Sequence, residues 1–68
     1  MRTFELIVDL PFLEKGSQFV FQDDNAWVYA ILDGEVAEYP LRTGLAAYLW
    51  LLLTDDGKYL KPVKEVEK

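Results

Sequence analysis

One long apolar segment stands out in the second half of the chain: Gly44-Leu45-Ala46-Ala47-Tyr48-Leu49-Trp50-Leu51-Leu52-Leu53. It is rich in Leu and Ala and has no β-branched residue, which favours a helix near residues 44–54 with Thr43 as its N-cap. The expected core-facing side carries Leu45, Tyr48, Leu49, Leu52 and Leu53. A buried strand over residues 45–53 is the alternative, because periodicity alone does not assign a short apolar run.

This helix is apolar nearly all round, since Trp50, Leu51 and the two alanines lie off the expected core-facing side. A chain this small buries only about 60% of its surface and has no second layer to cover both sides of a helix. We therefore expect a partner surface there. The candidate interface consists of Arg42 at the rim and of Ala47, Trp50 and Leu51.

The segments before the helix alternate as strands do. Residues 3–10, 17–22 and 26–32 each show period two, and Phe19 and Phe21 are expected to point inward. Turn-forming residues separate these segments, and Asp33-Gly34 is among the strongest short hairpin patterns. Residues 35–39 are then expected to form a further strand.

After the helix, a turn at residues 55–57 leads to a last short strand near residues 58–63, which Pro62 confines to a sheet edge. The predicted fold class is α+β: a small antiparallel β-meander of three to five strands, able to curl into a barrel, packed by one apolar helix. Residues 1–63 form a single domain, and residues 64–68 are expected to be a charged C-terminal tail.

The composition limits both stabilisation and partners. The 68 residues include no Cys and no His, so disulfides are excluded and transition metals lose their usual ligands. Association is the route that remains for stabilising so short a chain. A net charge of −5 disfavours direct binding to nucleic acid or to an anionic membrane.

Catalytic chemistry is hard to assemble from these residues. Without His the ordinary catalytic triad is missing. The acidic pairs Asp23-Asp24 and Asp55-Asp56 are typical of solvated turns, and they match neither paired catalytic carboxylates nor a calcium-binding loop as well. The aromatic residues of the adjacent strands are assigned to core packing and not to base stacking; they are Phe19, Phe21, Trp27 and Tyr29. We expect no enzyme activity, no cofactor and no metal.

The chain start shows no signal-peptide pattern, and its longest apolar run, residues 45–53, is short against the roughly 20 residues of a membrane-spanning helix. The expected location is the cytoplasm.

The run Leu10-Pro11-Phe12-Leu13-Glu14-Lys15-Gly16-Ser17-Gln18-Phe19 resembles the opening of short uncharacterised phage and prophage proteins. Residues 39–42 and 48–54 are similar to later parts of such proteins. The resemblance implies a mobile-element origin and carries no activity and no site residue.

Two functional hypotheses follow. The first is a cytoplasmic, non-catalytic interaction module that binds a copy of itself or another protein through the outer face of the helix. The alternative is an acidic inhibitor or nucleic-acid mimic, which would present Asp33, Glu35 and Glu38 to the basic groove of a nucleic-acid enzyme.

Overall fold

The computed structural model describes residues 2–63, and the predicted tail at residues 64–68 lies outside them. The elements follow the order β1 (Arg2–Leu6), β2 (Gln18–Phe21), β3 (Val28–Leu32), β4 (Glu35–Val36), α1 (Thr43–Leu53) and β5 (Leu60–Pro62). The fold is therefore α+β, as predicted, and residues 45–53 are helical.

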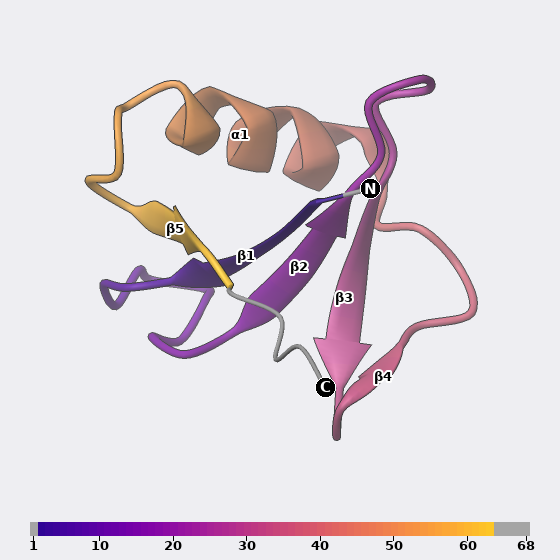
Figure 1. Ribbon diagram of the computed structural model, residues 1–68, viewed down its shortest axis with the longest axis horizontal. Coiled ribbons are helices and arrows are strands. Elements are labelled where there is room, and N and C mark those ends of the chain that lie inside the picture. The colour runs from indigo at the N-terminus through magenta and orange to yellow at the C-terminus, as the bar shows by residue number, and fades with distance from the viewer. Residues whose placement is uncertain (1, 64–68) are drawn as a thin grey trace, which may run out of the picture.

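The five strands form one antiparallel sheet in the order β4-β3-β2-β1-β5. The sheet is open and does not close into a barrel, because β4 and β5 lie at its opposite edges. Helix α1 connects these two edges and covers one face of the sheet (Figure 1). Pro62 lies in the edge strand β5, where a residue without an N–H group is tolerated.

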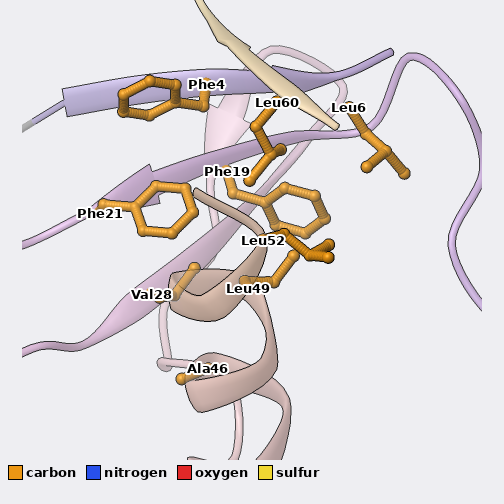
Figure 2. Close-up of a cluster of buried hydrophobic side chains, with 9 residues drawn as sticks. All are labelled: Phe4, Leu6, Phe19, Phe21, Val28, Ala46, Leu49, Leu52 and Leu60. Atoms are coloured by element: carbon orange, nitrogen blue, oxygen red, sulfur yellow. The ribbon is translucent and has the colours of Figure 1, made fainter. Parts of the chain in front are cut away.

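The core lies between α1 and this face of the sheet, and every strand except β4 contributes to it (Figure 2). Its buried residues are Phe4, Leu6, Phe19, Phe21, Val28, Ala46, Leu49, Leu52 and Leu60. The rings of Phe4 and Phe21 meet edge to face, with centroids 5.4 Å apart. Full burial of a side chain such as Phe21 or Leu49 is worth about 1.5–3 kcal/mol, so this layer supplies the main stabilisation of the fold.

The prediction for residues 3–10 is wrong beyond Leu6. A loop begins there, in which Leu10 and Leu13 bond to each other and the Asp9 carboxylate accepts the backbone N–H of Lys15 at 2.9 Å. These bonds replace a longer ladder. Leu13 packs against the core, whereas Phe12 at the tip of the loop is exposed. The Phe12 ring makes an edge contact with the ring of Tyr48, with centroids 5.3 Å apart.

The segment after Asp33-Gly34 forms a shorter strand than predicted. Both turn residues have positive φ, +54° and +81°, as a tight two-residue hairpin requires. Only Glu35 and Val36 pair as β4, after which the chain follows the outer edge of β3 through single backbone bonds from Ala37 to Ala30 and from Leu41 to Val28, each 2.8 Å long. Tyr39 does not extend the strand.

Two details of α1 differ from the prediction. Thr43 is the first helical residue and Arg42 occupies the N-cap position, where no side chain bonds to the free N–H groups. The five predicted core-facing residues all pack in or against the core, with Leu49 and Leu52 buried. The core-facing side is wider than predicted, because Ala46 is also buried and Trp50 also packs against the core.

Candidate functional site

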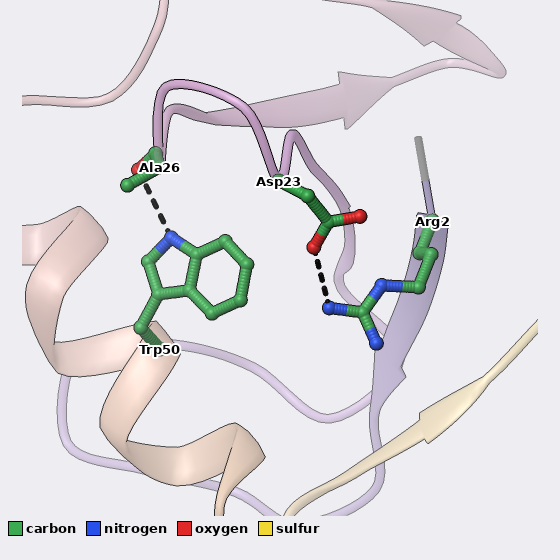
Figure 3. A network of polar contacts seen from close by, with 4 residues as sticks. All are labelled: Arg2, Asp23, Ala26 and Trp50. Carbon is green, nitrogen blue, oxygen red and sulfur yellow. Dashed lines mark hydrogen bonds and ion pairs between the residues drawn. The ribbon is translucent and has the colours of Figure 1, made fainter.

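The predicted interface residues on and beside α1 do not share one surface. Leu51 is 67% exposed, and Ala47 is exposed one turn before it, so these two form an outer ridge of the helix. Arg42 is exposed at the start of the helix. Trp50 points the other way, toward the loop that joins β2 and β3 (Figure 3).

Trp50 is held by contacts inside the chain. Its indole N–H donates to the carbonyl oxygen of Ala26 at 2.9 Å, and its ring meets the edge of Phe21 at a centroid distance of 5.0 Å. The guanidinium of Arg2 lies 5.9 Å from the indole ring and pairs with Asp23 at 2.7 Å (Figure 3). These contacts fasten the β2–β3 loop and the start of β1 onto the helix.

A cleft of about 420 Å³ lies between the β2–β3 loop and the start of α1. Its lining consists of Asn25, Ala26, Trp27, Pro40, Leu41, Arg42, Thr43, Ala46 and Ala47. Arg42 is the one charged residue of this lining, and its guanidinium makes no ion pair within residues 2–63. The cleft therefore combines apolar walls with one cationic side chain.

The loop wall of this cleft has a defined shape. Asn25 accepts the backbone N–H of Trp27 through its side-chain oxygen at 3.0 Å, and Ala26 adopts a φ of +61°. This local turn presents the Trp27 side chain, which is 49% exposed, with its ring centroid 6.4 Å from that of Tyr29.

The hairpin that joins β3 and β4 forms a second notable surface, the acidic turn, made of residues 32–36. Asp33 and Glu35 are both exposed there, and they are flanked by the exposed apolar side chains of Leu32 and Val36. Glu38, the third predicted acidic residue, is exposed in the segment that follows β4.

Charge is divided unevenly along the chain. Residues 16–41 contain five carboxylates and no Lys or Arg, so this part alone accounts for a charge equal to the net −5 of the whole chain. Asp23 is paired with Arg2. Residues 16–41 are therefore an anionic segment, whose carboxylates lie in the β2–β3 loop, in the β3–β4 hairpin and after β4, and Arg42 follows directly after it.

The sheet face opposite α1 carries no helix or strand of residues 2–63 (Figure 1). The cross-strand pairs Val20–Tyr29 and Ile31–Val36 lie on this face, because their neighbours Phe21, Val28 and Ala30 face the helix. Val20 is buried there nonetheless, Tyr29 and Ile31 are half-buried, and Val36 is exposed. The assignment of Trp27 and Tyr29 to the core is therefore wrong. Phe19 and Phe21 are buried as expected.

The sequence prediction missed this surface because it assigned the aromatic residues of both strands to the same core. The alternation already placed Trp27, Tyr29 and Ile31 on one side of their strand. A single helix covers only one face of a sheet, so the alternate face could have been expected to stay uncovered.

Within residues 2–63 no group of three His, Cys, Asp or Glu side chains is placed to hold a metal ion. The turn residues Asp24, Asp55 and Asp56 are exposed. Among residues 2–63, α1 is the one helix, and its 11 residues are too few to cross a membrane.

Comparisons with protein families, with curated proteins and with solved structures gave no match to this chain. The functional argument therefore depends on the surfaces described above.

Proposed function

We propose that this chain is a non-catalytic protein-interaction domain that associates with copies of itself. One observation carries the proposal: among residues 2–63, four of the six large hydrophobic side chains with high exposure lie along one edge of the sheet, here called the β3–β4 edge. These four are Trp27, Leu32, Val36 and Tyr39, with exposed fractions between 49% and 75%.

Their grouping matters more than their number. Single exposed apolar residues are ordinary on soluble proteins, whereas a contiguous apolar surface with a polar rim is typical of an interaction site. Val36 lies beside Ile31 on the uncovered sheet face, and Trp27 lies near Tyr29. Leu32 pairs with Glu35 and faces the other side of the sheet, so the β3–β4 edge presents apolar side chains on both of its sides. Glu35 and Glu38 are exposed beside them.

The proposed interaction surface is therefore the β3–β4 edge and not the outer face of α1 that the sequence suggested. Trp50 is already engaged by Ala26 and Phe21, which leaves Leu51 and Ala47 as a narrow ridge. Aromatic side chains such as Trp27 and Tyr39 are the residue types that contribute most to interface energies.

Sedimentation over a dilution series tests the proposal. We expect the wild-type mass to rise reversibly with concentration, and we expect the double variant Val36→Thr and Tyr39→Ser to lose at least about tenfold in association constant. Thr fits a strand, so the sheet should be retained. A control variant, Phe12→Ser, removes an equally exposed ring at a distant loop and should associate normally. A wild-type chain that stays monomeric at every concentration would refute self-association.

A second candidate function follows from the charge distribution. The absence of Lys and Arg from residues 16–41 leaves Asp33, Glu35 and Glu38 exposed in an anionic segment, as an inhibitor of a basic groove would need. A mobile-element origin, implied by the resemblance described above, would suit such an inhibitor.

Competition with DNA distinguishes this candidate. An inhibitor should displace a labelled DNA duplex from a basic nuclease, and Glu35→Lys with Glu38→Lys should remove the effect in a salt-sensitive manner. If the chain displaces no DNA from any of several basic nucleases at low salt, the mimic hypothesis loses its basis.

A further inference from the structure

The cleft and the acidic turn have complementary chemistry. The cleft offers Arg42 between apolar walls and contains no carboxylate in its lining. The acidic turn offers Asp33 and Glu35 between the exposed apolar side chains of Leu32 and Val36. Arg42, which has no ion pair among residues 2–63, and the two exposed carboxylates of the turn could form a charge-assisted contact.

Arg42 occupies a position that the helix itself disfavours. An N-cap residue stabilises a helix when its side chain accepts a backbone N–H, which an arginine cannot do. A positive charge at this end also opposes the helix dipole. Residues that break a local rule of this kind are expected at functional sites.

The acidic turn cannot fill the cleft of its own chain. The β2–β3 loop and the β3–β4 turn lie at opposite ends of strand β3 (Figure 1). Trp27 of this loop lines the cleft, and Asp33 belongs to the turn. Asp33 lies six residue steps beyond Trp27 along the strand, which corresponds to about 20 Å of extended chain. The turn therefore has to meet the cleft of another molecule.

We propose that the acidic turn of one copy docks into the cleft of a second copy, with Asp33 or Glu35 paired to the partner's Arg42. This inference rests on the self-association proposed above and specifies its contact. Because the two surfaces differ, the contact is heterologous and repeats head to tail, so that it builds chains or rings. One turn in one cleft buries less than the roughly 800 Å² per partner of a standard interface, so the contact is weak and forms at micromolar to millimolar concentration.

Two variants inactivate the two halves separately. Arg42→Ser removes the cation and supplies a good N-cap, so the helix is retained. Asp33→Asn with Glu35→Gln removes both charges from the turn, and Asn tolerates the positive φ of position 33. Each variant alone is expected to lose at least about tenfold in association constant, and wild-type association should fall between about 50 mM and about 500 mM salt.

Mixing the two variants is the decisive measurement. The Arg42→Ser variant keeps an intact acidic turn, and the turn variant keeps an intact cleft. In an equimolar mixture, the turn of the first can bind the cleft of the second, and no other turn–cleft contact can form. Sedimentation should then show a 1:1 pair and nothing larger. Two matched controls, Lys58→Ser and Asp55→Asn with Asp56→Asn, alter the same number of charges at exposed positions elsewhere and should associate as wild type does.

The outcomes separate the two proposals. If the wild-type chain is monomeric throughout, self-association and this contact both fail. If the wild type associates and both variants associate equally well, only the head-to-tail contact is wrong. In that case loss of association in Leu51→Asp would assign the contact to the outer ridge of α1, and loss in the double variant Val36→Thr and Tyr39→Ser would assign it to the β3–β4 edge without the cleft.

Discussion

Trp50 joins parts of the chain that are far apart in sequence. It bonds to Ala26, packs on Phe21 and lies beneath the guanidinium of Arg2. Its side chain therefore fixes the position of the β2–β3 loop, which forms one wall of the cleft. Loss of this residue should affect folding before it affects association.

We expect Trp50→Ala to lower the free energy of unfolding by about 2–3 kcal/mol, somewhat below the usual cost of truncating a fully buried Trp because the side chain is half-buried. Trp50→Phe keeps a ring against Phe21 but loses the hydrogen bond to Ala26, and it should cost about 1 kcal/mol. Urea unfolding of the three proteins checks the order. Equal midpoints for Trp50→Ala and the wild type would show that the contact contributes nothing.

At the scale of one element, the start of α1 combines a structural weakness with the charge of the cleft. Arg42 has the extended backbone of an N-cap, with φ −61° and ψ 155°, and the first helical turn has no acidic residue. A serine here would accept a free N–H group and would remove a cation from the positive end of the helix dipole.

We therefore expect Arg42→Ser to raise the free energy of unfolding by about 0.5–1 kcal/mol. Arg42→Ala loses the same charge without gaining a cap and should be less stable than Arg42→Ser. Chemical denaturation at a concentration where the protein is monomeric provides the measurement. A destabilised serine variant would mean that Arg42 supports the fold through its long side chain.

The strands show which features of an element are encoded locally. Alternation placed Phe19 and Phe21 inward correctly, because successive side chains in a strand always face opposite sides. The pair Asp33-Gly34 produced the expected hairpin because both positions require positive φ. Pro62 lies in an edge strand, as predicted, because proline has no N–H group to donate to a second neighbouring strand.

The position of Trp50 and the cleft depended on distant contacts. The periodicity of α1 selected its core-facing side correctly, but it left Trp50 outside that side. The bond from Trp50 to Ala26 joins residues 24 positions apart, so no local pattern in the helix could predict it. The cleft likewise needs residues 25–27 beside residues 40–47, an arrangement that follows from the path of the chain along β3.

At the scale of the whole molecule, stability and association should be linked. A chain of 68 residues without disulfides has a small core and a small net stability. Assembly that requires the folded state shifts the folding equilibrium by mass action. Each tenfold increase in concentration above the dissociation constant adds up to about 1.4 kcal/mol, which for a domain of this size corresponds to several degrees in Tm.

We accordingly expect the Tm of the wild-type chain to rise with protein concentration and to fall as salt screens the Arg42 contact. In Arg42→Ser the Tm should start higher, because of the new cap, yet stay constant across the same concentrations. Calorimetry at several concentrations of both proteins separates the two effects. A concentration-dependent Tm in both proteins would show that the copies meet through a surface other than the cleft, and a constant Tm in both would show that folding is independent of association.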